Sequence, residues 1–164
     1  MNKLDLLKDK IFTSEKLKHS LKVWHFLDQK IVFTNGCFDL IHLGHIDYLA
    51  KAADLGNKLI IGLNSDRSIS EFKGPHRPIL DEQSRAQILA SFFFVDAIIL
   101  FDEQTPLNLI ATIQPDILVK GADYTIDQIV GSDIVLKNGG EVKTIPYLPG
   151  YSTTAIEEKI KNSK

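Results

Sequence analysis

The sequence lacks the features that mark secreted and membrane proteins. Its 164 residues include a single cysteine, Cys37, so no disulfide can form within the chain, which favours a reducing compartment. The longest apolar stretch, residues 92–101, is interrupted by Asp96 and is far too short to cross a bilayer. Residues 1–10 alternate charged and apolar side chains without the apolar run of a secretory signal. We therefore predict a cytoplasmic protein with no membrane partner.

An excess of charge of either sign is also missing. The 19 basic and 21 acidic residues give a formal net charge of -2, and they are spread along the chain instead of gathered in blocks. This balance disfavours a nucleic-acid partner, although it leaves room for a local phosphate site. With 44% hydrophobic residues, a chain of this length favours one globular domain.

Helical patterns alternate with short apolar runs along the chain. Residues 13–28 repeat apolar side chains three or four apart and form the first predicted helix, which Thr13 or Ser14 would cap. Such an alternation predicts a parallel sheet covered on both faces. We predict an α/β fold of the Rossmann-like, three-layer α/β/α kind, with residues 1–29 as an N-terminal helical extension and residues 30–164 as the main domain. Its parallel five-stranded sheet would consist of residues 30–34, 58–64, 95–101, 116–120 and 142–145.

Single residues predict where helices begin and end. Gly56 is expected to end the second helix in a left-handed conformation, and Asp81 to cap a later one. The segment before Asp81, which contains Lys73 and is rich in glycine and proline, is predicted to be a polar loop. The last helix should begin at Ser152 or Thr153.

The residues that follow each predicted strand are the candidates for a site, because open parallel α/β sheets bind ligands beyond the carboxyl ends of their strands. Four groups fall on this edge. They are Asn35, Gly36, Phe38, Asp39, His42 and His45 after the first strand, Asp66 and Lys73 after the second, Gly121, Ala122, Asp123 and Tyr124 after the fourth, and Ser152, Thr153 and Thr154 at the last helix.

His42 and His45 lie three residues apart at the start of a predicted helix, so their side chains point to the same side. The positive end of that helix and its free N–H groups favour a bound phosphate. Two imidazoles that donate hydrogen bonds to a phosphate oxygen can stabilise the charge that develops in a displacement at phosphorus. Gly44 between them lets the backbone approach the ligand. Two other interpretations stay open: each ring satisfies a local hydrogen bond, or the pair ligates zinc with Asp39 or Cys37.

The other candidates are mainly cationic. Lys73 could carry a point charge onto a triphosphate from a mobile loop, and Arg77 and Arg85 could bind substrate phosphate. Arg85 could equally be a surface or ion-pair residue of its helix. Residues 152–154 could be a simple helix cap or an anion site. Cys37 is a poor nucleophile candidate, because free cysteines are mostly small buried hydrophobes.

Residues 34–45, Thr-Asn-Gly-Cys-Phe-Asp-Leu-Ile-His-Leu-Gly-His, resemble the Gly-x-Phe-Asp-x-x-His-x-Gly-His signature, or HxGH motif, of the cytidylyltransferase-like nucleotidyltransferases. Residues 152–154 are similar to the Ser-Thr-Thr element of that superfamily. The resemblance runs from about residue 13 to 162, and several separated motifs agree in order and spacing. Four more segments are similar to the D-glycero-β-D-manno-heptose 1-phosphate adenylyltransferases: Asn-Ser-Asp at 64–66, Phe-Lys-Gly at 72–74, Arg-Pro at 77–78 and Val-Lys-Gly-Ala-Asp-Tyr at 119–124.

The resemblance implies transfer of AMP from ATP to D-glycero-β-D-manno-heptose 1-phosphate, which gives ADP-heptose for the lipopolysaccharide core and pyrophosphate. It implies that His42 and His45 stabilise the α-phosphate and that Lys73 helps pyrophosphate leave. Mg²⁺ would accompany ATP, with no metal held by the protein itself. The residues expected around the nucleotide are Asn35, Gly36, Phe38, Asp39, Asp66, Lys120, Gly121, Asp123, Ser152, Thr153 and Thr154.

The resemblance further implies a homodimer. A sugar kinase domain, often fused to these adenylyltransferases, has no room in 164 residues, which implies a separate heptose kinase upstream. The main alternative is a cytidylyltransferase that uses CTP with glycerol 3-phosphate or another small alcohol phosphate. Residues 148–151, Leu-Pro-Gly-Tyr, disfavour it because glycerol-3-phosphate cytidylyltransferases carry an arginine there. A non-catalytic nucleotide-binding module would not need His42, His45 and Lys73 together, and an aminoacyl-tRNA synthetase fragment would need a Lys-Met-Ser-Lys-Ser-like segment that the chain lacks.

Overall fold

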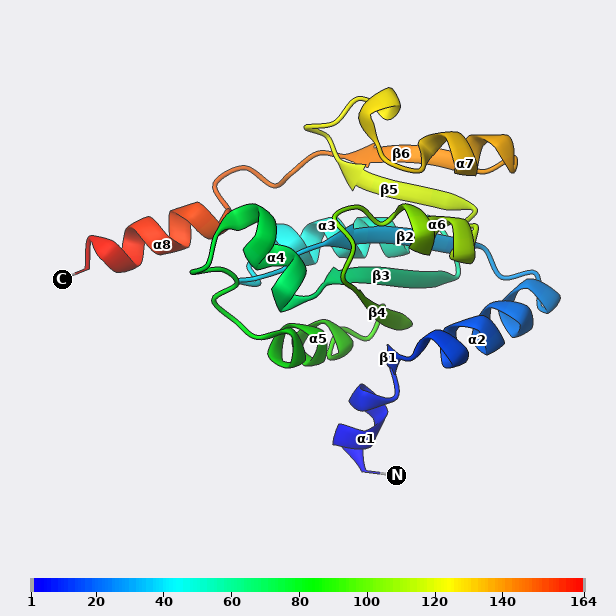
Figure 1. Ribbon diagram of the computed structural model, residues 1–164, viewed down its shortest axis with the longest axis horizontal. Coiled ribbons are helices and arrows are strands. Elements are labelled where there is room, and N and C mark those ends of the chain that lie inside the picture. Colours follow the sequence, from blue (N-terminus) through cyan, green and yellow to red (C-terminus); the bar gives the residue numbers. More distant parts are fainter. Residues whose placement is uncertain (1, 164) are drawn as a thin grey trace.

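The strands form one parallel sheet (Figure 1). The computed structural model describes residues 2–163. Within them the sheet has six strands in the order β1-β4-β3-β2-β5-β6, and all neighbours are parallel. This confirms the Rossmann-like parallel α/β architecture. The strands are β1 (Ile11–Phe12), β2 (Ile31–Gly36), β3 (Lys58–Asn64), β4 (Ala97–Phe101), β5 (Ile117–Gly121) and β6 (Glu141–Ile145).

The sixth strand, β1, differs from the prediction of five. It is two residues long and pairs with β4 at one edge of the sheet, with Ile11 opposite Ile98. A pair of residues has no periodicity, so no sequence pattern can indicate it. The helix that follows, α2 (Ser14–Phe26), is capped by Thr13 as expected and buries Leu17 and Leu21. The division at residue 29 into an extension and a main domain stays a prediction.

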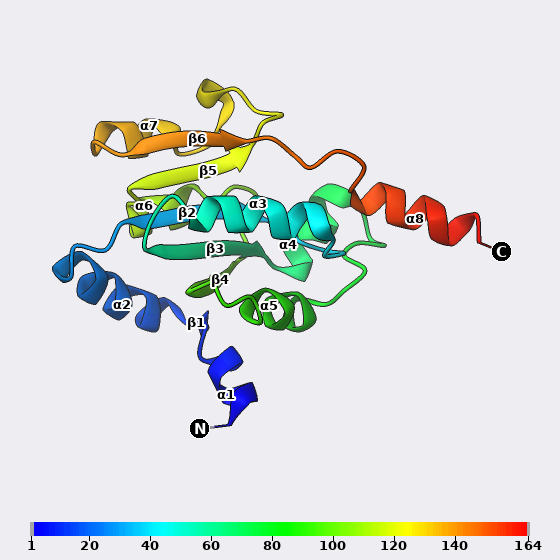
Figure 2. The same ribbon diagram turned by 180° about the vertical axis from the view of Figure 1, so that it is seen from behind.

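Helices cover both faces of the sheet, as the continuous apolar strands require. α3 (Leu43–Ala53) and α5 (Glu82–Ala90) pack on one face, and α2, α6 (Leu107–Ile113) and α7 (Ser132–Lys137) pack on the other. Figures 1 and 2 show α3 and α6 on opposite sides of the sheet. Within β2, Val32 joins the first apolar layer, while Ile31 and Phe33 join the second. The short elements α1 (Lys3–Lys8) and η1 (Ile126–Gln128) complete this part of the fold.

Two local predictions are wrong. The segment predicted as a polar loop contains a helix, α4 (Asp66–Lys73), whose cap Ser65 accepts a hydrogen bond from the Ser68 N–H at 3.1 Å. Gly56 does not adopt a left-handed conformation; α3 ends before it, at Ala53, with Asp54 as the C-cap residue. A Cβ atom at Gly56 would lie only 2.6 Å from the Lys30 carbonyl oxygen, so close approach to the start of β2 explains the glycine.

The last helix, α8 (Thr153–Lys161), extends away from the sheet in both ribbon views. Its N-cap is Ser152, whose hydroxyl accepts from the Ala155 N–H at 3.1 Å, as predicted for the start of this helix. None of its residues is buried. Between residues 2 and 163, no helix is both long enough and apolar enough to cross a membrane.

The chain reverses its direction across the sheet between β2 and β5. From β2 it adds β3 and β4 on one side, and it then returns to add β5 and β6 on the other. At such a switch point the loops after the two adjacent strands separate and leave a crevice at the carboxyl edge. The fold therefore places a ligand site between the segments that follow β2 and β5.

Candidate active site

A cavity of about 810 Å³ opens at this switch point. Its size is in the range of nucleotide and cofactor sites. It gathers residues from the ends of β2 and β5, the start of α3, the end of α4 and the start of α8. Most of the candidates lie in its wall: Asn35, Gly36, Phe38, Asp39, His42, His45, Lys73, Arg77, Lys120, Gly121, Ser152 and Thr153.

The imidazoles of His42 and His45 are stacked in this wall. Their ring centroids are 3.8 Å apart, with an angle of 27° between the ring planes. Phe38 packs edge-on against the His45 ring at 5.4 Å between centroids. Both Nδ1 atoms are buried without a hydrogen-bond partner among the described residues. Neither ring therefore makes a local hydrogen bond through Nδ1.

The environment keeps both rings neutral near pH 7. Burial lowers the pKa of His42. Burial, together with the neighbouring His42 and Lys73, lowers the pKa of His45 to about 4. Because these shifts arise from desolvation and from cationic neighbours, a polyanion in the cavity would reverse them. The site is thus short of negative charge in the absence of a ligand.

The start of α3 is open toward the same cavity. His42 is its N-cap residue, but no side chain caps the helix there, and the first turn has no acidic residue. The free N–H groups and the helix dipole therefore favour an anion at this end. Gly44 lines the cavity between the two histidines, and a Cβ there would lie 3.0 Å from His42 Nδ1 and 3.3 Å from Tyr151 Cβ. Glycine is required for this close packing.

Lys73 is the last residue of α4 and is solvent-exposed in the cavity wall. A rigid helix end, not a loose loop, therefore carries this ammonium. Its neighbour on the β2 loop is Cys37, a partly buried thiol. Burial raises the pKa of Cys37 despite the nearby cations of Lys73 and Arg85. A protonated, partly buried thiol is a poor nucleophile, which agrees with the expectation for Cys37.

Lys120 and Gly121 lie at the end of β5, on the other side of the crevice. Lys120 Nζ donates to the Asn35 carbonyl oxygen at 3.4 Å, and burial lowers the pKa of this lysine. Gly121 lies directly under Tyr147: a Cβ at residue 121 would be 2.0 Å from the Tyr147 hydroxyl oxygen. Asp123 is exposed and outside the cavity wall. Burial and, after it, the Asp123 carboxylate raise the pKa of Tyr147 to about 12.

Asp39 organises the wall instead of facing the ligand. Its carboxylate accepts hydrogen bonds from the N–H groups of Ile79 and Leu80 at 2.9 Å and pairs with Arg77 at 3.3 Å. Arg77 lines the cavity, and its other terminal nitrogen pairs with Glu157 of α8. The loop that follows α4 is thus fastened to the HxGH segment and to the last helix.

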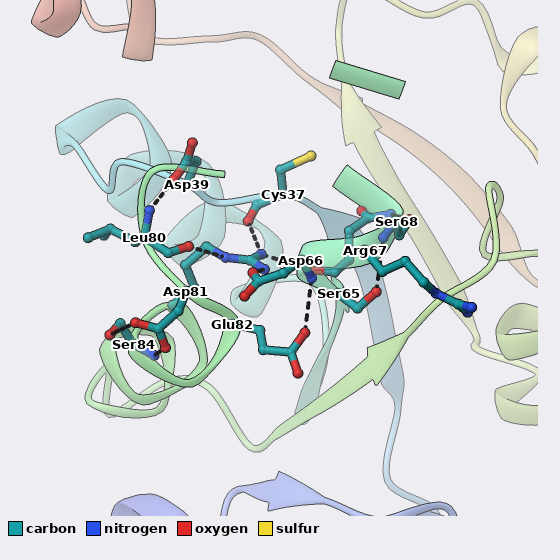
Figure 3. A network of polar contacts seen from close by, with 12 residues as sticks. Cys37, Asp39, Ser65, Asp66, Arg67, Ser68, Leu80, Asp81, Glu82 and Ser84 are labelled. Carbon is teal, nitrogen blue, oxygen red and sulfur yellow. Dashed lines mark hydrogen bonds and ion pairs between the residues drawn. The ribbon is translucent and has the colours of Figure 1, made fainter. Parts of the chain in front are cut away.

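Arg85 and Asp66 are not brought to the cavity. The Arg85 side chain is fully buried on α5 and donates to the carbonyl oxygens of Leu80, Cys37 and Asn64 at 2.7–3.0 Å. It also pairs with the Asp66 carboxylate at 2.7 Å. Figure 3 shows three of the residues that accept from this side chain, Cys37, Asp66 and Leu80, in one network of polar contacts. A guanidinium with no exposed surface cannot bind substrate phosphate. The proposed phosphate role of Arg85 is therefore replaced by a structural one: it joins the ends of β2 and β3 to α5.

The last helix contributes two of its three candidates. Ser152 and Thr153 line the cavity, whereas Thr154 is exposed and outside its wall. Tyr124, which follows β5 and was among the residues expected at this edge, also lines the cavity. The sequence reasoning missed other parts of the wall. Tyr147 and Tyr151 follow β6, Gln128 follows β5, and residues 104–106 follow β4, so the strand-end rule would have found them had it been applied to every strand. Tyr48, on α3, also lines the wall and does not follow a strand.

A zinc site finds no support in the side-chain geometry. Within residues 2–163, no group of three or more histidine, cysteine, aspartate or glutamate side chains is arranged to hold a metal ion. Asp39, which was considered as a further ligand beside the histidine pair, is already engaged by two backbone N–H groups and by Arg77.

The chain is similar to proteins of known sequence and structure. It is 49% identical over 156 residues to the bifunctional protein HldE of Magnetococcus marinus, which covers 95% of this chain and 32% of that protein. It is 53% identical over 163 residues to the bifunctional protein HldE of Campylobacter jejuni subsp. doylei, with 99% and 34% covered. The chain thus spans about a third of the length of these curated relatives.

Among solved structures, the lipopolysaccharide core biosynthesis protein of Thermoplasma volcanium is similar, with a TM-score of 0.60 and 32% identity. The similarity covers 73% of this chain and 97% of that one. The cytidylyltransferase-like family model matches residues 33–159, which include most of β2, all of β3 to β6 and every candidate named above. The chain therefore belongs to the cytidylyltransferase-like family.

Proposed function

We propose that this chain is an adenylyltransferase that transfers AMP from ATP to D-glycero-β-D-manno-heptose 1-phosphate and releases pyrophosphate. The observation that carries the proposal is the stacked pair His42–His45 at the uncapped start of α3, in the wall of a cavity of nucleotide size. The printed name of the Thermoplasma relative, a lipopolysaccharide core biosynthesis protein, supports a sugar as the acceptor. The similarity to the HldE proteins, with about half of the aligned residues identical, supports the proposal as well.

In the proposed reaction, a phosphate oxygen of the sugar 1-phosphate attacks the α-phosphorus of ATP. The bond from the α-phosphorus to the bridging oxygen breaks, and the electron pair leaves with pyrophosphate. No covalent enzyme intermediate forms. His42 and His45 donate hydrogen bonds to the α-phosphate oxygens, where charge grows in the transition state. Lys73 neutralises the departing pyrophosphate, which collects negative charge as the bond breaks.

The remaining wall residues bind and orient. The first-turn N–H groups of α3 and α8 donate hydrogen bonds to the phosphates. Ser152 and Thr153, at the start of α8, line the cavity at this point. Asn35, Gly36, Phe38 and the β5 end hold the nucleoside, and the Asn35 Oδ1 atom is buried without a partner and so is available to a ligand donor. These assignments rest on position in the wall and on the family motif.

Mg²⁺ belongs to the substrate in this proposal. The described residues include no cluster of carboxylates that could form a metal cage, and Asp39 is occupied by protein donors. Mg²⁺ bound mainly by triphosphate oxygens needs no such cage. We therefore treat MgATP as the species that enters the cavity. A homodimer, a cytoplasmic location and a separate upstream heptose kinase stay predictions.

Pyrophosphate release tests the proposal and its alternative in one experiment. ATP and CTP are each offered with D-glycero-β-D-manno-heptose 1-phosphate and with glycerol 3-phosphate, and pyrophosphate is measured by a coupled assay. The proposal expects turnover with ATP and the heptose phosphate at least tenfold above every other pair. Preference for CTP with glycerol phosphate would replace it with the cytidylyltransferase alternative, and no turnover with any pair would contradict both.

A further inference from the structure

Helix α8 is joined to the body of the protein by a single polar contact. Among the described residues, the only hydrogen bond or ion pair between a side chain of α8 and the rest of the chain is that of Glu157 with Arg77. No α8 residue is buried, so the helix has little apolar packing to hold it in place. The Glu157 side chain itself is only 19% exposed, which reduces its screening by solvent.

The partner in this contact, Arg77, is itself fixed. Its second nitrogen pairs with Asp39 at 3.3 Å, and the Asp39 side chain is 7% exposed and bound by the N–H groups of Ile79 and Leu80. A charge-assisted contact to such an immobilised guanidinium positions a carboxylate more firmly than one to a freely rotating lysine. Glu157 is therefore tied through Arg77 to the HxGH segment.

The contact between Glu157 and Arg77 affects the wall of the cavity. Ser152 and Thr153, at the start of the same helix, line its wall together with Arg77 and Asp39. Glu157 lies about one helical turn after Thr153, so fixing Glu157 fixes the helix start. We propose that Glu157 is a positioning residue: by holding Arg77 it keeps the Ser152–Thr153 end of α8 against the phosphate end of the cavity. This rests on the proposed function for the identity of the nucleotide, but the docking of α8 can be measured without any substrate.

Two variants distinguish the effect of losing this contact from the effect of losing one negative charge on α8. Glu157→Ala removes the contact. Glu158→Ala is the matched control, because Glu158 is the next residue of the same helix and is exposed without an ion pair among the described residues. Alanine preserves helix propensity in both. Hydrogen exchange of the amides of residues 153–161 is measured on each full-length protein without ligand. We expect exchange to accelerate at least fivefold in Glu157→Ala and to stay within about twofold of wild type in Glu158→Ala.

Kinetics supply the second measurement. If α8 contributes binding groups that hold ATP equally in the ground and transition states, its release raises KM with little effect on kcat. We expect Glu157→Ala to raise the KM for ATP about tenfold with kcat within about twofold. Glu158→Ala should leave both unchanged. An unchanged KM in Glu157→Ala would overturn the positioning role, even with faster exchange.

A double-variant comparison tests whether Glu157 acts through Arg77. In an Arg77→Gln background, Glu157→Ala should produce no further acceleration of α8 exchange, because the contact is already absent. Additive acceleration would contradict the route through Arg77. Unchanged exchange in Glu157→Ala would overturn the proposal whatever the substrate is. Failure of the wild-type protein to release pyrophosphate with ATP would instead count against the proposed function and leave the exchange result intact.

Discussion

The rings of His42 and His45 stack at 3.8 Å between centroids, with their Nδ1 atoms buried and unpartnered. Two imidazoles in this arrangement repel each other when both are protonated, and burial adds to the cost of charging them. The pair is therefore stable as neutral rings until an anion enters the cavity. Charge compensation by a triphosphate would then favour hydrogen-bond donation from both.

The first prediction concerns turnover. His42→Ala and His45→Ala should each lower kcat by about 10²–10⁴-fold, because each removes a donor to the charge that develops at the α-phosphate. ATP affinity, measured by calorimetry, should fall less than tenfold. His19→Ala is the control, since His19 is exposed on α2 and does not line the cavity, and it should retain wild-type rates. Wild-type kcat in either cavity variant would refute the role of the pair.

The second prediction concerns acid sensitivity. The folded-state pKa of His45 is about 4, against an unfolded value of 6.5, so between these values the unfolded chain binds more protons than the folded one. Stability therefore falls as the pH falls from 6.5 toward 4, and the full penalty is reached below pH 4. At pH 5 the single group should cost about 2 kcal/mol of unfolding free energy relative to pH 7.5.

Urea unfolding at pH 7.5 and pH 5 measures this cost. His45→Gln cannot take up a proton and should lose about 2 kcal/mol less between the two pH values than wild type does. His19→Gln should retain the wild-type difference. Equal pH dependence in His45→Gln and wild type would show that His45 titrates normally in the folded protein.

The third prediction concerns Arg85. Arg85→Lys should destabilise the protein by about 3 kcal/mol, because a single ammonium cannot replace four donor contacts in a site without solvent. Arg67→Lys is the matched control, as its pair with Asp102 is exposed, and it should change stability by less than about 0.5 kcal/mol. Urea unfolding checks both. A neutral Arg85→Lys would contradict the structural role.

The fourth prediction concerns the packing of Tyr147 on Gly121. Gly121→Ala puts a Cβ at 2.0 Å from the Tyr147 hydroxyl oxygen and at 2.8 Å from Asp123 Oδ1, so the tyrosine must leave its place in the cavity wall. We expect ATP affinity to fall about tenfold, with the fold intact by circular dichroism. In a Tyr147→Ala background the same substitution should have a markedly smaller effect, because the clash with the ring is gone. Equal losses in both backgrounds would place the defect elsewhere.

Much of the fold could be predicted from local patterns. Apolar runs indicated β2 to β5, since a strand in the middle of a parallel sheet is buried on both faces. Capping residues marked the starts of α2, α5 and α8, because an N-cap bond is made within four residues. β1 and α4 escaped prediction: β1 is too short to show a period, and α4 is a polar, mostly exposed helix next to glycine and proline.

The histidine pair, Lys73 and the start of α8 were identifiable because the carboxyl ends of all strands in a parallel sheet lie at the same edge, whatever their order along the chain. Lys120 was identified by the resemblance to the family motif. Arg85 and Asp66 show the limit of this reasoning. Both were candidates for binding a ligand at this edge, yet they pair with each other and neither lines the cavity.

The sequence by itself determined the parallel α/β architecture and the residue types available at its carboxyl edge, because periodicity and capping depend on near neighbours. Only the tertiary structure decided which of those charges are free for a ligand. Arg85 and Arg77 look alike in sequence, but one is fully buried among carbonyl oxygens and the other bridges Asp39 and Glu157 at the cavity wall. Burial and partner choice depend on segments far apart in the chain, and no local pattern records them.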